Sequence, residues 1–365
     1  MIPMKKKVVQ ILYGGLGGHA SVAFSLIEGD RQKEFEHRLL FFGIEELTAE
    51  YRERCDKGGI AYRSIVKQGK LPLNDWRKVY KCLSDWQPDV IVLHSTTLIF
   101  PMVLFHKLKK CRLIFVEHTP NHIKSRNEWF ASRWGMRFAD KVVFLTDVYR
   151  EEMIKVLGTK YRKEKVTVIP NGIDVALFSP DETSAAQAQR DIGMIGRFSI
   201  TKNQEELIDC FHQLVTNGLL PEWKLHLAGD GTCLAPLKEK VKQYQLQDRV
   251  IFYGNIREDQ IVSFLRKIRI YVHATKGETM STAIMQAMAC GLPVIGTDVA
   301  GVSNMIDDGN TGLLYQSSGE PALAQCLMSV IENDALRLNL ARNARSYALE
   351  HYSLENMFMR YKSVF

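Results

Sequence analysis

Two basic residues in the second half of the sequence could together hold a diphosphate. Arg197 directly follows an apolar stretch, within Gly196-Arg197-Phe198, and Lys202 comes five residues later. An arginine supplies a planar fork of donors and a lysine a compact charge, so the pair suits the two phosphates of one pyrophosphate. Such cations would neutralise the charge that grows on a leaving phosphate, a task that otherwise falls to a divalent metal. Two solvated cations without a ligand are the alternative.

A loop carboxylate is the second candidate for chemistry. Glu278 lies between a predicted strand and a helix that begins at Thr282. The N–H groups of Met280 and Ser281 would point out of the start of this helix, where the helix dipole favours an anion. Gln286 lies about one turn beyond Thr282 and shares its face. A loop glutamate is usually solvated, but one at a helix start beside two cations indicates a functional site.

A glycine-rich turn lies near the N-terminus. A predicted strand, Val8–Tyr13, runs into Gly14-Gly15-Leu16-Gly17-Gly18 and then into a helix. Glycines at such a turn let the backbone approach a ligand, and the helix start favours phosphate. The spacing differs from the G-x-G-x-x-G pattern of dinucleotide-binding proteins, which disfavours an NAD-linked dehydrogenase. A tight turn without a ligand is the alternative here.

The composition indicates a globular protein of two domains. The chain has 365 residues, of which 46% are hydrophobic and 24% charged. No apolar stretch approaches ~20 residues, so we expect neither a transmembrane helix nor a signal peptide. The seven cysteines have no paired spacing, which favours free, buried thiols in a reducing compartment and argues against a cysteine metal site.

Short β-branched stretches alternate with helical patterns along most of the chain, which predicts parallel sheets covered on both faces. A polar, small-residue segment at 179–190 interrupts the alternation and indicates a linker. We therefore expect an α/β fold with two Rossmann-like doubly wound domains facing across a cleft, at 1–178 and 191–350. A helix at 351–365 is expected to cap the second domain or to cross back to the first. The expected strands are Val8–Tyr13, Arg38–Phe42, Val90–His94, Leu113–His118, Val142–Leu145 and Val166–Ile169, then Ile192–Ile195, Lys224–Ala228, Val250–Tyr253, Ile270–His273, Pro293–Gly296 and Gly312–Tyr315.

The charge is distributed unevenly. Residues 1–180 carry a net charge of +10 and the remainder −3, within a total of +7. A basic first half suggests that it faces an anion: nucleic acid, an anionic membrane surface or a phosphorylated acceptor. Ordinary solvated lysines are the alternative.

Several motifs occur together in the second half in a fixed order. They are Ile169-Pro-Asn-Gly-Ile-Asp174, Gly196-Arg-Phe with Lys202, Leu227-Ala-Gly-Asp-Gly231, Phe252-Tyr-Gly254-Asn255, the stretch from Glu278 to Pro293, and Ala300-Gly-Val. Their order and spacing over roughly 150 residues resemble the family 4 retaining glycosyltransferases, whose fold is known as GT-B. The first half is similar more loosely, through Gly17-Gly18 and His118.

The resemblance implies a role for each matching residue. Arg197 and Lys202 would bind the donor diphosphate, Asn255 the base, and Glu278 the hydroxyls of the transferred sugar. The remaining donor-binding positions would be Gly17, Gly18, Met280, Ser281, Thr282 and Gln286. His118, which by itself would more often be a satisfied strand-end histidine, would contact the sugar across the cleft and join Glu278 in catalysis.

The chain departs from the family pattern at two positions, because Gln286 and Asn304 stand where the family has acidic residues. The resemblance nevertheless implies a cytoplasmic retaining glycosyltransferase that uses a nucleoside diphosphate sugar, with uridine as the nucleoside, and no metal. We expect a glycan or lipid-linked acceptor of the cell envelope, an anionic membrane surface and no nucleic acid as partners, with the protein peripheral on the inner membrane. A sugar-nucleotide epimerase, a polymer synthase and a non-catalytic nucleotide-sugar-binding protein are the alternatives.

Overall fold

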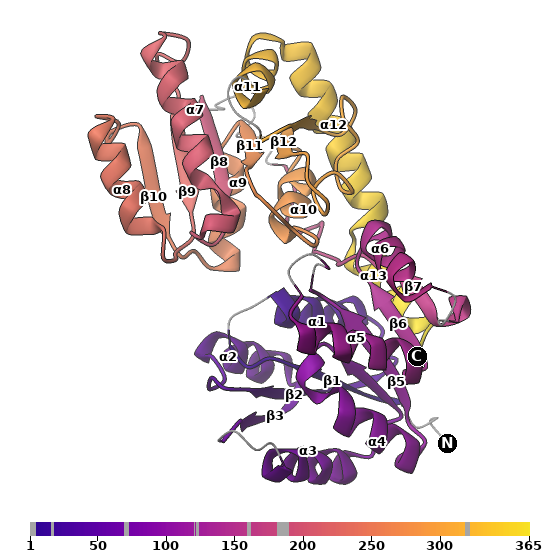
Figure 1. Cartoon of the computed structure of the whole chain (residues 1–365). Coiled ribbons are helices and arrows are strands. Elements are labelled where there is room, and N and C mark those ends of the chain that lie inside the picture. The colour runs from indigo at the N-terminus through magenta and orange to yellow at the C-terminus, as the bar shows by residue number, and fades with distance from the viewer. Residues whose placement is uncertain are drawn as a thin grey trace. The chain divides into compact units, whose positions relative to one another are not determined.

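The computed structural model divides into two compact units, each of which is described here by itself (Figure 1). The described residues are 5–15, 18–68, 73–119, 121, 124–158, 162–180, 190–317 and 322–365, with the backbone alone for residues 18 and 19. Unit 1 comprises Met1–Gly172 and Leu354–Phe365, and unit 2 comprises Ile173–Ser353.

Unit 1 contains a seven-stranded parallel sheet in the order β3-β2-β1-β4-β5-β6-β7. Its central strands are buried on both faces, which is why their sequences are apolar without alternation, apart from Lys7 and the buried Gln10 of β1. The strands are β1 (Lys7–Leu12), β2 (Glu36–Gly43), β3 (Ala61–Val66), β4 (Val90–Leu93), β5 (Arg112–Glu117), β6 (Lys141–Phe144) and β7 (Val166–Val168). The helices are α1 (Gly18–Gly29), α2 (Ala49–Gly58), α3 (Leu73–Trp86), α4 (Ile99–Lys109), α5 (Arg126–Phe138), α6 (Asp147–Leu157) and α13 (Leu354–Lys362).

Unit 2 contains a six-stranded parallel sheet in the order β10-β9-β8-β11-β12-β13. Its apolar core centres on buried residues such as Met194, Leu227 and Val272. The strands are β8 (Asp191–Ile195), β9 (Lys224–Ala228), β10 (Val250–Gly254), β11 (Ile270–His273), β12 (Val294–Thr297) and β13 (Leu313–Tyr315). The helices are α7 (Gln204–Thr216), α8 (Leu234–Gln243), α9 (Glu258–Lys267), α10 (Thr282–Ala289), α11 (Ala322–Glu332) and α12 (Asp334–His351).

The boundary between the units falls at Gly172, before the expected domain end at 178. The physical reason is Arg345 of α12, whose guanidinium donates to the carbonyl oxygens of Val175, Phe178 and Ala289. These bonds hold the segment after Gly172 onto unit 2. The expected linker at 179–190 is described only at 179–180 and 190.

Helix α13 belongs to unit 1, where it packs against α1. Its buried side chains Met357, Phe358 and Tyr361 recur at helical spacing. Gly29 of α1 permits the close approach, because a Cβ atom there would lie 2.9 Å from Cβ of Phe358. The C-terminal helix therefore crosses back to the first unit, one of the two outcomes that its sequence allowed.

The two-unit, parallel α/β architecture expected from the sequence is confirmed. Each of the twelve expected strands is present, two with the expected bounds and the others with ends that differ by at most two residues. Strand β3 was not expected. It forms the sheet edge, and its exposed residues Ala61, Arg63 and Ser64 leave no apolar run to recognise.

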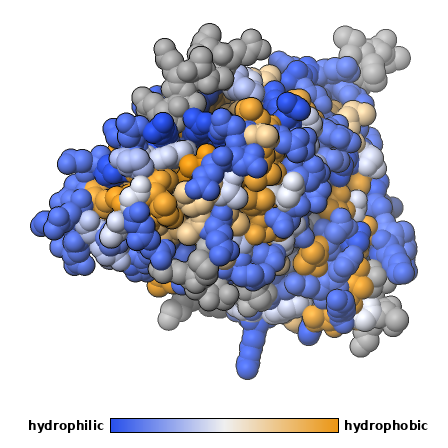
Figure 2. All heavy atoms as spheres, turned by 90° about the horizontal axis from the view of Figure 1, so that it is seen from above, coloured by the Kyte–Doolittle hydropathy of each residue, from blue (hydrophilic) through white to orange (hydrophobic). Residues whose placement is uncertain are grey.

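The surface in Figure 2 carries hydrophobic residues in groups among hydrophilic ones. Single exposed apolar side chains are ordinary on a protein surface and need no explanation. Within the described residues, no helix has both the length and the apolar character needed to cross a membrane.

Candidate functional site

The strand order of unit 2 reverses between β8 and β11, which pair in parallel. In an open parallel sheet, ligands bind beyond the carboxyl ends of the strands at such a reversal. Arg197 and Lys202 follow β8, and Glu278 follows β11. The topology therefore places the three residues singled out by their chemistry at one edge of one sheet.

Lys202 and Glu278 are in direct contact, through Nζ and Oε2. Their side chains are largely buried, with exposed fractions of 21% and 16%. Burial alone would raise the pKa of Glu278, but a hydrogen bond from His273 and the charge of Lys202 outweigh it and lower this pKa to about 2. The carboxylate is therefore ionised throughout the neutral range.

His273 of β11 contacts this carboxylate, and Tyr271 of the same strand contacts His273. His273 Nε2 lies 3.3 Å from Glu278 Oε2, and its Nδ1 lies 3.2 Å from the Tyr271 hydroxyl. Burial lowers the pKa of His273, so the ring is neutral. In a neutral ring that donates from Nε2 to the carboxylate, Nδ1 can only accept. The Tyr271 hydroxyl that faces Nδ1 also lies 3.3 Å from Ile195 O, so its one proton is shared between two acceptors. Sequence reasoning missed both residues, although a histidine ending an otherwise apolar strand was the available signal.

The loop that carries Arg197 is braced by the glycines of the next loop. The N–H of Phe198 donates to Asp230 O at 2.9 Å, and Gly196 N–H donates to Ala228 O at 3.0 Å. Gly229 has a φ of +133°, and a Cβ atom at this position would meet the Gly196 carbonyl. The glycine of the Leu227–Gly231 motif at position 229 therefore permits the close approach of the two loops. Arg197 itself is exposed, and its carbonyl accepts from Gln204 Nε2 at 3.0 Å.

The Glu278 loop is braced in the same way by the turn after β12. Gly301 has a φ of +88°, and a Cβ atom there would lie 2.6 Å from the carbonyl carbon of Glu278 and 2.8 Å from Thr279 O. On the other side, Thr275 Oγ1 donates to Thr201 O at 3.0 Å, and Lys276 N–H donates to the same oxygen at 2.7 Å. These bonds join the Glu278 loop to the turn that carries Lys202.

Helix α10 begins beside Glu278, but the N–H of Ser281 is arranged differently from our expectation. Ser281 N–H faces Met305 Sδ at 3.3 Å, so it does not point out toward a ligand. The Ser281 hydroxyl caps the helix by accepting from Ile284 N–H. Met280 is buried, Thr282 is half-buried, and Gln286 is only 6% exposed.

Asn255 follows strand β10 and is exposed. Gly254 before it has a φ of +68°, and its carbonyl accepts from Gly229 N–H at 2.7 Å. This bond links the third carboxyl-end loop to the loop that braces Arg197. Asn304, the other departure from the family pattern, has a buried Nδ2 without a partner among the described residues.

In unit 1, His118 directly follows strand β5 and belongs to a hydrogen-bonded chain of polar side chains. Its Nε2 lies 2.9 Å from His94 Nδ1, and His94 Nε2 lies 3.1 Å from Gln10 Oε1. Gln10 Nε2 in turn donates to Ala23 O at 3.1 Å. Because Gln10 Oε1 can only accept, a neutral His94 donates from Nε2 and accepts from His118 at Nδ1. The chain therefore fixes which nitrogen of His118 carries the proton. A glutamine inside the apolar strand β1 was the sequence signal.

The glycine-rich turn of unit 1 is described only in part. Gly17 lies outside the described residues, and Gly18 is the first residue of α1. The carboxylate of Glu45 lies against Gly15, where a Cβ atom would be 2.9 Å from its carboxyl carbon. A phosphate at this part of the turn would meet negative charge, so the described geometry does not favour phosphate there.

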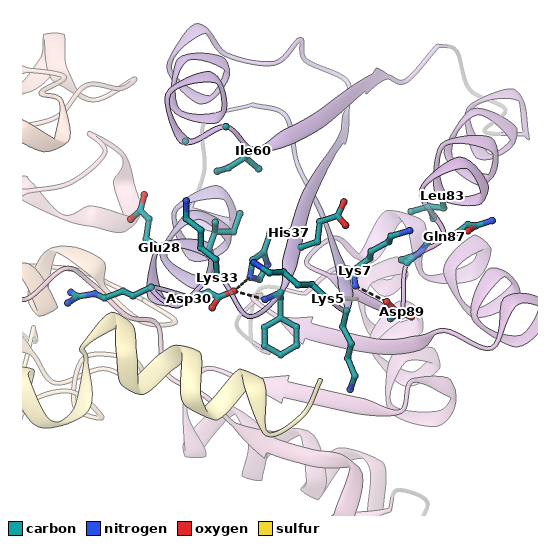
Figure 3. Close-up of a pocket in the computed structure, with 18 of the residues that line it drawn as sticks. Lys5, Lys7, Glu28, Asp30, Lys33, His37, Ile60, Leu83, Gln87 and Asp89 are labelled. Carbon is teal, nitrogen blue, oxygen red and sulfur yellow. Dashed lines mark hydrogen bonds and ion pairs between the residues drawn. The ribbon is translucent and has the colours of Figure 1, made fainter. Parts of the chain in front are cut away.

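A cavity of about 1290 Å³ lies in unit 1 at the opposite, amino-terminal edge of the sheet (Figure 3). Lysines at the start of β1 line it, together with Asp30 and His37, whose side chains point toward each other at 3.2 Å. The C-terminal ends of α1, α2, α3 and α4 also contribute, and their carbonyl dipoles attract cations. Because ligands of such sheets bind at the carboxyl ends, this cavity is not the candidate site.

Comparison with known sequences gives the same assignment for both units. The sequence model for "Glycosyl transferases group 1" matches residues 178–347, and that for "Glycosyltransferase Family 4" matches residues 16–177. A similar curated protein is N-acetyl-alpha-D-glucosaminyl L-malate synthase of Bacillus anthracis, 26% identical over 50% of this chain and 47% of its own length. Another is the gpi3 subunit of the phosphatidylinositol N-acetylglucosaminyltransferase of Schizosaccharomyces pombe, 30% identical over 54% of this chain and 42% of its own length. The matches thus span about half the length of these relatives.

Comparison with solved structures shows the fold. HepE of Anabaena, crystallised in complex with UDP, has a TM-score of 0.83 and 20% sequence identity, and the match covers 98% of this chain and 99% of that one. The same protein in complex with UDP-glucose has a TM-score of 0.82 over 98% of both chains.

Proposed function

Because the chain belongs to glycosyltransferase family 4, we propose that it transfers a sugar from a nucleoside diphosphate sugar to an acceptor hydroxyl and keeps the anomeric configuration. The contact between Lys202 and Glu278 at the strand reversal of unit 2 supports the proposal, because a cation suited to phosphate lies beside a carboxylate suited to sugar hydroxyls. Uridine is the proposed nucleoside, a choice supported by the UDP-glucose complex of the similarly folded HepE.

In this proposal Arg197 and Lys202 bind the donor diphosphate, and Asn255 lies beside the base. Glu278, ionised and held by His273, accepts hydrogen bonds from hydroxyls of the transferred sugar. Gln286 contributes a hydrogen bond to the ribose. His118 contacts the sugar from unit 1 and assists catalysis.

The proposed reaction is a displacement on one face of the sugar. The bond between the anomeric carbon and the diphosphate oxygen breaks, and its electron pair stays on that oxygen. The acceptor oxygen forms the new bond on the same face, and its proton passes to the leaving diphosphate. Arg197 and Lys202 stabilise the negative charge that develops on the diphosphate. Stabilisation of such developing charge is usually the largest single contribution to an enzyme's rate enhancement.

We propose that this step needs no divalent metal, because the two cations already supply positive charge at the leaving group. Turnover measured with chelator and then with added magnesium or manganese tests this. Activity that collapses in chelator and returns only with metal would contradict the proposal.

The proposed acceptor is a lipid-linked oligosaccharide or another glycan of the cell envelope, reached at the cytoplasmic face of the inner membrane. The charge of the first half, +10 over residues 1–180, supports an anionic surface as its partner. Nucleic acid is not proposed as a partner.

Thermal-shift screening of nucleotide sugars, followed by product analysis, tests the function. A ligand at about 100 times its dissociation constant stabilises a protein by roughly 2.7 kcal/mol, so the donor should stand out. We expect slow hydrolysis of this donor to the free sugar with retained configuration. Conversion to an epimer without acceptor would identify an epimerase, and binding without any hydrolysis would identify a binding protein.

A further inference from the structure

The exposed faces of α4 and α5 in unit 1 form one continuous apolar surface. On α4, Leu104 is 58% exposed and Leu108 is 61% exposed, and on α5, Phe130 is 51% exposed. The two helices pack against each other. Phe100 joins them, because its ring lies 5.5 Å from that of Phe130 and 4.6 Å from that of Trp134.

The pattern on α5 is regular. Phe130, Trp134 and Phe138 recur every fourth residue, so they form one stripe, and Trp134 contacts the other two rings at 6.0 and 4.7 Å. The buried residues of α5, among them Ala131 and Gly135, lie on the adjoining face, since Ala131 and Gly135 precede Trp134 and Phe138 by three residues. Phe130 is exposed and Trp134 and Phe138 are half-buried, so the stripe lies at the edge of the core and turns Phe130 to solvent.

Basic side chains surround this surface. Lys107 Nζ lies 4.8 Å from the centre of the Phe138 ring, and the Arg137 guanidinium lies 5.5 Å from it. Arg133 is exposed on the same side of α5, and Lys109 and Lys110 are exposed at the end of α4. Helix α4 contains no acidic residue, and the single one in α5, Glu128, is engaged in the capping box with Ser125. Asp140, beyond α5, lies 3.5 Å from His106 at the rim.

We propose that this α4–α5 surface, defined by Phe100, Leu104, Leu108, Phe130, Trp134 and Phe138 with Lys107, Arg133 and Arg137, is the docking surface for an anionic lipid bilayer. Aromatic rings and leucines on one side of a helix, flanked by arginine and lysine, are the features that hold a protein in the interface of a membrane. The positive rim is complementary to anionic headgroups, and each cation near such a surface is worth about 1 kcal/mol. A protein partner would need acidic groups to match this rim across an apolar centre.

This inference rests on the proposed function in one respect: the docking surface would bring the enzyme to a membrane-bound acceptor. Within Phe105–Arg112, Phe105 and Cys111 are buried in unit 1, so that stretch does not bind as a unit.

Flotation of the full chain with liposomes tests the proposal. We expect binding to vesicles of phosphatidylcholine with phosphatidylglycerol, weaker binding to phosphatidylcholine alone, and release by salt, because a Debye length shortens with ionic strength. The triple variant Lys107→Gln/Arg133→Gln/Arg137→Gln should bind the anionic vesicles about 100-fold more weakly, at roughly fivefold per cation. The apolar variant Leu104→Ser/Leu108→Ser/Phe130→Ser should lose binding to both vesicle types.

Matched controls lie elsewhere on unit 1. Ile44 and Leu73 are 70% and 68% exposed, and Arg77 and Lys81 are exposed on α3. Ile44→Ser/Leu73→Ser and Arg77→Gln/Lys81→Gln should bind vesicles like the unchanged chain. Equal binding by the α4–α5 variants and these controls would overturn the proposal. So would a change from dimer to monomer in the apolar variant, since it would make this surface an interface between copies.

Donor hydrolysis without vesicles separates the two proposals. The α4–α5 variants should hydrolyse the nucleotide sugar normally, because none of their residues belongs to the donor site. A chain that binds vesicles through this surface but uses no nucleotide sugar would refute the proposed function and leave the docking surface intact. Hydrolysis of the nucleotide sugar without vesicle binding would refute the docking surface and leave the proposed function intact.

Discussion

In the proposed site, Glu278 would compete with the donor diphosphate for Lys202, because the two side chains are in direct contact. The contact joins Lys202 Nζ and Glu278 Oε2. A diphosphate that binds Lys202 must weaken this ion pair and also approach a second negative charge. Glu278→Gln removes the charge and keeps the size of the side chain, so we expect tighter binding of UDP, which lacks the sugar that Glu278 would hold.

The size of the effect follows from the burial of the pair. Exposed ion pairs contribute about 0–1 kcal/mol, and breaking a buried one costs about 3–5 kcal/mol. With 21% and 16% of the two side chains exposed, this pair lies between these limits. A net effect of about 1–2 kcal/mol corresponds to UDP affinity roughly 5–30-fold higher in the variant.

Isothermal titration of UDP into both proteins measures this, and steady-state turnover with the full donor completes the test. Turnover of Glu278→Gln should fall steeply even though UDP binds more tightly. Glu205→Gln is the matched control, because Glu205 pairs with Lys240 on the exposed side of unit 2. If Glu278→Gln bound UDP no better than the unchanged protein, the proposed competition between Glu278 and the diphosphate for Lys202 would be refuted.

Four further outcomes are expected. Arg197→Ala should lower turnover about 100-fold with a smaller change in donor affinity, since charge grows on the diphosphate as the bond breaks; normal turnover in steady-state assays would place the diphosphate elsewhere. Gln286→Ala should weaken donor binding by about 0.5–1.5 kcal/mol in titration calorimetry. Gln286→Glu should keep turnover and hold or tighten donor binding. A Gln286→Glu protein that binds donor but transfers no sugar would show that Gln286 has a role other than contacting the ribose. Gly301→Ala should cost much more turnover than Gly309→Ala, because both have positive φ but only Gly301 touches the Glu278 backbone; equal losses in a kinetic comparison would mean that backbone strain alone is measured. Because the pKa of Glu278 in the folded protein is about 2, below its ordinary 4.5, the stability it contributes is present above pH 4.5 and lost as the pH falls toward 2, so urea unfolding should depend less on pH in this range for Glu278→Gln than for the unchanged chain.

Residues that carry charge at loop positions could be identified from the sequence alone. Arg197, Lys202 and Glu278 were recognised by their types and by the strands before them, and the structure brings Lys202 and Glu278 into contact. Parallel strands end at one edge, so residues just after predicted strands are placed by topology without any knowledge of side-chain packing.

Residues that act through others could not be identified in this way. Tyr271 and His273 lie in a strand whose apolar pattern describes burial and does not reveal which polar atoms meet inside it. Gln10 and His94 pair across neighbouring strands, and their register depends on the sheet order, which a single sequence does not specify. The N–H of Ser281 was misplaced because Met305, its partner, comes from a turn distant in the sequence.

The return of α13 to unit 1 makes that unit a discontinuous domain with unit 2 as an insertion. The two passages of the chain run side by side, since Ile173 pairs with Ser353 and Ile173 N–H donates to Tyr352 O at 2.8 Å. Gly172 N–H also faces Met357 Sδ at 3.0 Å, so the end of the first segment of unit 1 lies close to the start of its second segment. Unit 2 can therefore be excised as the single segment 173–353, and a short linker from Gly172 to Leu354 would close unit 1 on itself. A protease that cuts one passage would leave the two units joined through the other.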